Sequence, residues 1–144
     1  MEDRYLFRAK RIDNGEWVQG NLIQSCDATD GWETIIISIK NSNMFTKHIK
    51  RGYGDLGFEN WHKVDKDTIC QCTGLKDKNG KLIWENDIVK INNSKVNTVI
   101  AFRDFEIICT IPNEKYYKHR LEYDTEYDVI GNIFDNPELL ESEG

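Results

Sequence analysis

The sequence has no apolar run that approaches the roughly 18 residues needed to cross a bilayer as a helix. Met1–Arg4 opens the chain with charged side chains, and no apolar secretory segment follows it. The chain also contains no internal repeat, no heptad pattern and no low-complexity segment. We therefore expect a soluble protein that resides in the cytoplasm and has no membrane partner.

Positive charge is scarce relative to negative charge. The 19 lysines and arginines are outnumbered by 25 aspartates and glutamates, which gives a formal net charge of -6 at pH 7. Binding to a nucleic-acid backbone gains affinity from basic side chains that displace counterions, so a diffuse electrostatic interaction over the whole surface is not expected. A local basic patch stays compatible with this composition.

The four cysteines lack the spacing of a metal or redox site. Cys70 and Cys72 are separated by one residue, whereas zinc ribbons and redox pairs usually separate their thiols by two, and no second pair follows. In a strand these two side chains would share a face. We expect Cys26, Cys70, Cys72 and Cys109 to be reduced and mostly buried, and we expect no metal and no cofactor.

What the chain does contain is a series of β-branched and aromatic segments separated by turn residues. They recur about every 8 to 12 residues, which is typical of an all-β barrel or sandwich. With 144 residues and 39% apolar side chains, the chain is long enough to bury a core without covalent crosslinks. The sequence therefore predicts an all-β fold.

The stretch Val64–Ile91 is the clearest of these segments. Thr68–Leu75 and Lys81–Trp84 read as two strands, and Asn79-Gly80 between them is a strong signal for a two-residue hairpin turn with positive φ at the glycine. A polar turn then leads to a third strand, Ile88–Ile91. The pattern predicts a compact antiparallel unit.

The amino-terminal part predicts a hairpin whose turn is Asp13–Glu16, followed by a strand over Trp32–Ile39 that is buried on both faces and pairs with it. A weaker strand is expected over Met44–Ile49. Arg51–Phe58 spells the glycine spacing of a dinucleotide-binding loop, but no helix and no βαβ unit follow it. We interpret this stretch as a mobile surface loop.

The carboxy-terminal part predicts strands over Val96–Arg103 and Phe105–Ile111, and a last strand over Tyr127–Phe134. Asn113–Tyr123 between them is compatible with a strand edge or with an irregular excursion. Gly131 within the last strand indicates a bulge or a close approach of other atoms.

A short helical turn is expected after the last strand. Asn136 is predicted to cap it, with Pro137 at its first position.

Several motifs resemble the YopX family of phage and prophage proteins. The most specific one is Cys70–Lys81, which continues as Ile83–Val89. Phe7–Ala9 and Trp17–Gly20 near the start and Val129–Leu140 near the end are similar to the same family. The resemblance covers nearly the full length, although Asn86 stands where the family often has glycine and Cys72 where it often has an aromatic residue.

The resemblance implies an SH3-like β-barrel without assigned biochemical activity. We expect this barrel in residues 64–144, an additional β-hairpin and strand layer in residues 1–50, and a flexible glycine-rich loop in residues 51–63 between them. The only plausible seam lies in that loop, and the parts are expected to form one compact unit. The family supplies no catalytic residues.

For each group of residues that could take part in catalysis, a role without catalysis is the simpler interpretation. Glu85 and Asp87 could act as paired carboxylates, but Asn86 and Asp87 more commonly bond their own turn backbone. The three histidines are too far apart in the sequence for a metal-ligand pair, and no nucleophile accompanies them. We therefore expect no enzyme.

One candidate interaction surface combines basic and aromatic side chains, a combination on which single strands can stack if the two segments meet. It comprises Lys47, Lys50, Arg51 and Tyr53 in one segment and Tyr116, Tyr117, Lys118 and Arg120 in the other. Solvated loop charge is the simpler interpretation of both segments.

Three functions stay open. The first is a phage-encoded accessory protein without enzymatic activity, which forms homo-oligomers or binds an unknown phage or host protein through a strand edge and an aromatic patch. The second is a nucleic-acid-binding module that uses segments 47–53 and 115–120. In the third, which the balance of acids and bases disfavours, acidic side chains imitate DNA phosphates.

Overall fold

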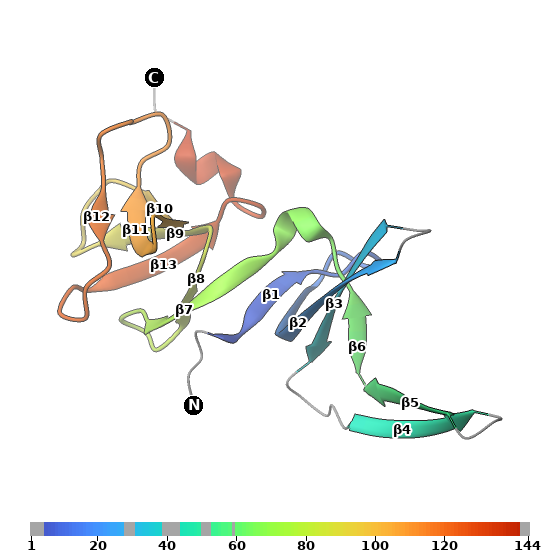
Figure 1. Ribbon diagram of the computed structural model, residues 1–144. Helices are drawn as coiled ribbons and strands as arrows, with labels where there is room; N and C mark the ends of the chain where they lie inside the picture. The colour runs from blue at the N-terminus through green and yellow to red at the C-terminus, as the bar shows by residue number, and fades with distance from the viewer. Residues whose placement is uncertain (1–4, 28–30, 39–43, 50–52, 59, 142–144) are drawn as a thin grey trace. The chain divides into compact units, whose positions relative to one another are not determined.

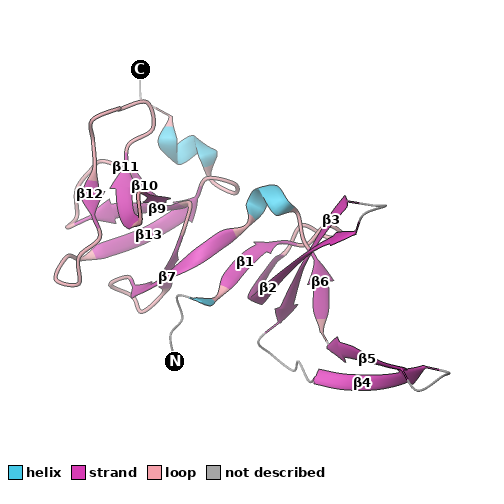
Figure 2. Ribbon diagram, viewed as in Figure 1, coloured by secondary structure: helices cyan, strands magenta, loops and turns pink. Residues whose placement is uncertain are grey.

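The computed structural model describes residues 5–27, 31–38, 44–49, 53–58 and 60–141 (Figure 1). The chain forms two compact units. The amino-terminal unit is Leu6–Ile69, and the carboxy-terminal unit is Cys70–Gly144 with Met1–Tyr5. Within the described residues the assigned elements are antiparallel strands and short 3-10 turns (Figure 2), so the predicted all-β class is confirmed.

Four strands of the amino-terminal unit lie side by side in the order β6-β3-β2-β1. They are β1 (Phe7–Lys10), β2 (Trp17–Asp27), β3 (Gly31–Ser38) and β6 (Trp61–Lys63). The predicted first hairpin is confirmed by the pairing of β1 with β2, and β3 pairs with β2 as expected. Ile36 and Ile37 are both buried although successive strand residues point to opposite faces, which confirms that both faces of β3 are covered. Ala9, Val18, Ile36 and Val64 form the core.

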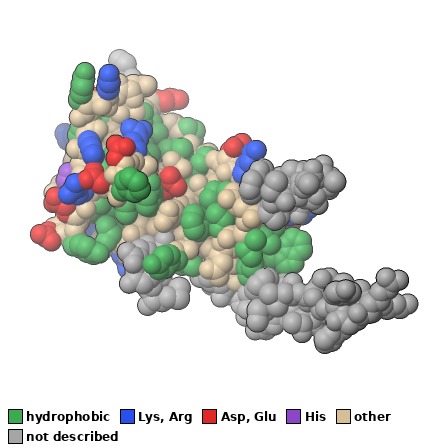
Figure 3. Space-filling view, viewed as in Figure 1, with side chains coloured by type: hydrophobic (Ala, Val, Ile, Leu, Met, Phe, Trp, Pro, Cys, Tyr) green, Lys and Arg blue, Asp and Glu red, His purple; other side chains and the backbone are tan. Residues whose placement is uncertain are grey.

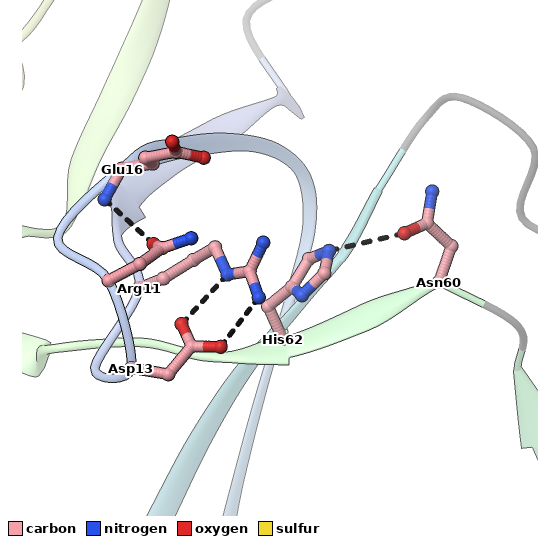
Figure 4. A network of polar contacts seen from close by, with 6 residues as sticks. Arg11, Asp13, Glu16, Asn60 and His62 are labelled. Atoms are coloured by element: carbon pink, nitrogen blue, oxygen red, sulfur yellow. Dashed lines mark hydrogen bonds and ion pairs between the residues drawn. The ribbon is translucent and has the colours of Figure 1, made fainter.

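The turn between β1 and β2 is held by its own side chains (Figure 4). The Arg11 guanidinium donates from Nε and Nη2 to the two carboxylate oxygens of Asp13, at 2.9 and 2.6 Å. This hydrogen bond lowers the pKa of Asp13 below its ordinary value. The Glu16 amide donates to Asn14 Oδ1 at 2.9 Å. Each of these contacts is exposed to solvent, so they fix the turn geometry more than they stabilise the fold.

The strands β4 (Met44–Ile49) and β5 (Tyr53–Phe58) form a separate antiparallel pair. The weaker strand predicted over Met44–Ile49 is therefore confirmed. The prediction of a surface loop over Arg51–Phe58 is wrong for Tyr53–Phe58, which forms β5. The strand pairs with β4 through main-chain hydrogen bonds, which glycine can form as well as any other residue. Arg51 and Gly52 lie outside the described residues.

The boundary between the units lies between Ile69 and Cys70, after the 3-10 turn η2 (Lys66–Thr68). It falls a few residues beyond the seam expected within residues 51–63.

The carboxy-terminal unit contains a hairpin and a larger antiparallel sheet. The hairpin is β7 (Cys70–Lys76) with β8 (Leu82–Trp84). The sheet has the order β12-β11-β10-β9-β13. Its members are β9 (Asp87–Ile91), β10 (Thr98–Arg103), β11 (Glu106–Thr110), β12 (His119–Arg120) and β13 (Tyr127–Asn132). Closure of these strands into an SH3-like barrel stays a prediction.

Most predicted strands of this unit are confirmed, with boundaries shifted by one or two residues. The open segment Asn113–Tyr123 consists of turns apart from the two residues of β12. The core contains Ile83, Val89, Ile100, Cys109 and Tyr127. These five residues belong to five different strands. No single hairpin of this unit can therefore bury its apolar face alone.

The turn of the β7–β8 hairpin is longer than the sequence predicts. The Asp77 amide donates to the Lys81 carbonyl at 2.7 Å and the Gly80 amide to the Asp77 carbonyl at 3.0 Å, so three residues lie between the closing pair. Gly80 has φ +82°, which confirms the predicted positive φ, but the two-residue turn is wrong. This geometry is that of a three-residue hairpin loop with glycine in the left-handed position.

Replacing Gly80 with valine is expected to lower the free energy of unfolding by roughly 1 to 3 kcal/mol, since a β-branched residue is strained at positive φ. No atom lies within 4 Å of the position that a Cβ would take, so the loss would be conformational and not steric. Chemical denaturation of Gly80→Val measures it, with Lys81→Val in the same exposed turn as control. An unchanged midpoint for Gly80→Val would contradict the assigned turn.

The last strand carries both features predicted for Gly131. The register of β13 against β9 shifts between Val129 and Gly131, which marks a bulge. A Cβ on Gly131 would lie 2.5 Å from Asn136 Oδ1, which is a close approach.

The 3-10 turn η3 (Pro137–Leu140) confirms the predicted helical turn with proline at its start. Asn136 occupies the predicted N-cap position, but its side chain makes no capping hydrogen bond to η3. Asn136 Oδ1 accepts a hydrogen bond from the Asn132 amide at 3.3 Å, because the side chain lies over Gly131 and not over η3.

Candidate interaction surface

Both candidate carboxylates of the central stretch accept hydrogen bonds from backbone amides. Asp87, only 2% exposed, accepts a hydrogen bond from the Trp84 amide at 2.8 Å, which confirms its predicted role in the turn. Glu85 Oε1 accepts from the Gln71 amide at 3.2 Å. Asn86 has φ +69°, a conformation that glycine adopts most readily. Its side chain was expected to bond the turn and instead donates to Cys70 Sγ at 3.6 Å.

Asp77 is a structural residue that sequence reasoning missed. Its side chain is 6% exposed. Oδ1 accepts hydrogen bonds from the amides of Asn79 and Lys81, each at 2.9 Å, and Oδ2 accepts from the Val129 amide at 3.1 Å. The carboxylate therefore joins the β7–β8 turn to β13. An aspartate at the start of a turn is a recognisable signal for the local bonds, but no sequence signal points to Val129.

The cysteines of the carboxy-terminal unit carry thiols outside any disulfide and are buried, as predicted. Burial raises the pKa of Cys109 to about 11, although a hydrogen bond with Thr98 opposes the shift. The side chain of Cys26 lies outside the described residues. At neutral pH the Cys109 thiol is thus almost entirely protonated, a state unsuited to nucleophilic or metal-binding work.

In a chain carrying Cys26→Ser, Cys70, Cys72 and Cys109 are expected to resist a disulfide reagent until the protein unfolds. Burial keeps the reagent away from all three thiols, and the raised pKa of Cys109 also suppresses its thiolate, which is the reactive species. Absorbance of the released chromophore, followed with and without denaturant, measures the difference. Rapid release by the native chain would contradict the burial of these thiols.

The described histidines make local contacts. His119 Nε2 lies 3.4 Å from the Tyr127 hydroxyl, which also accepts a hydrogen bond from the Glu122 amide at 2.9 Å. Burial raises the pKa of Tyr127. His62 Nε2 lies 3.1 Å from Asn60 Oδ1 (Figure 4). The side chain of His48 lies outside the described residues.

No group of three or more histidine, cysteine, aspartate or glutamate side chains with the arrangement of a metal site occurs among the described residues. No described 3-10 turn is long and apolar enough to cross a membrane.

The predicted basic and aromatic segments lie in different units. Lys47, Lys50, Arg51 and Tyr53 belong to the amino-terminal unit, and their side chains lie outside the described residues. In the carboxy-terminal unit, Tyr116 is 90% exposed and Tyr117 is 36% exposed. Lys118 Nζ lies 2.8 Å from Glu106 Oε2, and the Arg120 guanidinium binds Glu106 Oε1. One carboxylate thus offsets part of the charge of both cations.

Glu106 is expected to titrate below the ordinary glutamate range, because hydrogen bonds from Lys118 and then Arg120 lower its pKa. A carboxylate whose pKa falls on folding stabilises the fold above its unfolded pKa. That contribution is lost as the pH falls through the lowered value. Carboxyl-carbon NMR measures the midpoint, with Lys118→Gln/Arg120→Gln as control, in which it should return to the ordinary range. An ordinary midpoint in the native chain would contradict the ion pairs.

Phe105 is the most exposed aromatic side chain of the described chain, and sequence reasoning missed it. Arg103 pairs with Glu106, so Asp104 and Phe105 form a two-residue hairpin tip between β10 and β11. Their φ values are +51° and +66°, as in a type I′ turn, where glycine is preferred at Phe105. The ring is fully exposed. On the face shown in Figure 3, hydrophobic side chains of this unit reach the surface beside charged ones.

An open hollow of about 1120 Å³ lies at the other end of β10 and β11. It is lined by Lys95, Asn97, Ile111, Pro112, Asn113, Glu114, Glu138, Leu139, Leu140 and Glu141. Asn97 Nδ2 donates to the Leu139 carbonyl at 2.7 Å and so ties η3 to the start of β10. The lining is apolar at Ile111, Pro112 and the two leucines and carries three glutamates against one lysine.

Fold and surface together define a small antiparallel β protein whose buried polar side chains hold turns and whose carboxy-terminal unit exposes aromatic side chains. The chain matches the YopX family, described as "YopX protein", over residues 6–141, and it belongs to this family. It is also similar to a solved structure described as the crystal structure of protein EF1440 from Enterococcus faecalis. The two are 29% identical, with a TM-score of 0.56, over 94% of this chain and 96% of that one. No curated protein matches.

Proposed function

We propose that the protein is a non-enzymatic accessory protein of a bacteriophage or prophage that works in the host cytoplasm. It would act by binding proteins, and its main partner would be another copy of itself. Membership of the YopX family supports the phage origin. Exposed strand edges suit self-association, because they present unpaired backbone groups. We propose no cofactor for this function.

The observation that carries the proposal is the contrast between the chain's polar and aromatic side chains. Glu85 and Asp87, the candidate carboxylate pair, and the buried Asp77 are each engaged with backbone amides. Phe105 and Tyr116, by contrast, expose nearly their whole surface to solvent. Large exposed aromatic side chains are the residues that most often anchor protein interfaces.

Sedimentation velocity of the native chain over a wide range of protein concentration tests the proposal. We expect the weight-average sedimentation coefficient to rise with concentration. A strictly monomeric chain that also captures no phage or host protein in a pulldown would refute it.

Nucleic-acid binding is the second candidate, and one contact favours it. Lys115 Nζ lies 5.8 Å from the centre of the Tyr116 ring, which places a cation and an exposed aromatic side chain together. Glu106 weakens this candidate, because it pairs with both Lys118 and Arg120. Titration with single- and double-stranded oligonucleotides at low and moderate salt decides the matter. Binding that weakens with salt and disappears in Lys118→Glu/Arg120→Glu would support it, and no binding would exclude it.

A further inference from the structure

The hairpin tip combines two unfavourable features in one residue. Phe105 has φ +66°, a conformation in which bulky side chains are strained. Its ring is fully exposed, so no burial within the chain offsets that strain. Backbone strain that persists in a folded protein is often found where a ligand or partner is bound. Burial of the ring in a partner would supply the missing stabilisation.

The hollow is mixed in polarity and offers apolar contacts at four of its ten lining residues. Ile111 and Pro112 follow β11, and Leu139 and Leu140 belong to η3. All four are apolar, so a phenyl ring in contact with them would lose water from the face that touches them. The volume of about 1120 Å³ exceeds what one aromatic side chain needs, so neighbouring tip residues can enter with it.

The charges of the tip and the hollow are complementary. Arg103 and Asp104 precede Phe105 and are exposed, and Glu106, which follows it, pairs with Lys118 and Arg120. The hollow carries Glu114, Glu138 and Glu141, and one lysine, Lys95. Arg103 can face the glutamates while Asp104 faces Lys95. Complementary charges at the rim of an interface favour the correct orientation of the partners.

The tip and the hollow lie at opposite ends of the same two strands. Arg103 pairs with Glu106 at the tip, and Val99 pairs with Thr110 next to the hollow. Four residue steps separate these pairs, which corresponds to about 14 Å along a strand. The tip of one copy therefore meets the hollow of another copy and not its own.

We infer that copies of this chain associate head to tail, with Phe105 of one copy inserted into the hollow of the next and Arg103 against its glutamates. Different surfaces of the two copies meet in this contact, so it propagates into a ring or a filament and does not stop at a symmetric dimer. The inference rests on the proposed self-association and specifies its surfaces.

Two complementary variants test the inference by sedimentation equilibrium. Phe105→Gly removes the inserted ring with a residue that suits the turn, and Leu139→Arg places a positive charge in the hollow opposite Arg103. Each variant alone is expected to be monomeric at concentrations where the native chain forms larger species. An equimolar mixture should form dimers and nothing larger, because it contains one intact tip and one intact hollow per pair.

Two controls keep the test decisive. Tyr116→Gly, which removes an exposed aromatic side chain outside the tip, should assemble like the native chain. If Leu139→Arg fails to fold, as judged by circular dichroism, Glu114→Lys/Glu138→Lys replaces it as the hollow variant.

Several results would overturn the inference. Native-like assembly of Phe105→Gly, or a mixture that stays monomeric, would refute the head-to-tail contact while leaving self-association in place. A native chain that is monomeric at every concentration would refute both the contact and self-association.

Discussion

Replacing Gly20 with alanine is expected to lower the free energy of unfolding by roughly 3 to 5 kcal/mol, at the upper end for a single substitution. A Cβ on Gly20 would lie 1.8 Å from the Ile37 carbonyl oxygen and 3.1 Å from the Ser38 Cα. Both are backbone atoms of β3, so relief requires the β2–β3 pairing to separate locally. Because Gly20 also pairs with Phe7 in β1, β2 has no free side toward which it can shift.

Chemical denaturation followed by circular dichroism measures this loss, and hydrogen exchange locates it. Asn21→Ala is the matched control, since Asn21 is the next residue of the same strand and is exposed. We expect the control to stay close to the native midpoint and Gly20→Ala to lose protection in β2 and β3. Equal midpoints for the two variants would show that the strands are not as close at Gly20 as described.

Replacing Asp77 with alanine should lower the free energy of unfolding by a similar amount, roughly 3 to 5 kcal/mol. The substitution removes the acceptor of three backbone amides, those of Asn79, Lys81 and Val129. When partly buried donors are left without a partner, the protein loses more stability than the hydrogen bonds themselves had contributed. The β7–β8 turn would also lose its connection to β13.

Thermal and chemical unfolding of Asp77→Ala test this expectation. Asp124→Ala, which removes an exposed carboxylate from another turn of the same unit, is the control and should change stability little. Asp77→Asn should be intermediate, because an amide retains one acceptor oxygen but not the second. A native-like midpoint for Asp77→Ala would mean that water replaces the carboxylate and that the residue is not structural.

The sequence predicts those parts of the fold that depend on near neighbours. Alternation of apolar and polar residues, together with turn residues a few positions away, predicts three of these parts. They are the hairpin of β1 and β2, the burial of both faces of β3, and the positive φ of Gly80. The bulge at Gly131 follows from a single glycine inside a strand pattern. In each case the local preference and the folded structure agree.

Long-range pairing determines what the sequence does not predict. The extended conformation of Tyr53–Phe58 depends on β4, whereas its own glycines favour a loop. Glu106 meets Lys118 and Arg120 only because β12 pairs with β11, and Asp77 meets Val129 only because β13 passes the turn. The conformation of Phe105 likewise depends on the register between β10 and β11, which places the bend at that residue and not at a glycine.

The most direct test of the account is the stability of Phe105→Gly at a concentration where the native chain is monomeric. If Phe105 serves association and not the fold, glycine should relieve the strain at positive φ and raise the free energy of unfolding by about 1 kcal/mol. Urea denaturation of the two chains under identical conditions measures the difference. A less stable Phe105→Gly chain would show that the ring packs within its own fold and would contradict the account.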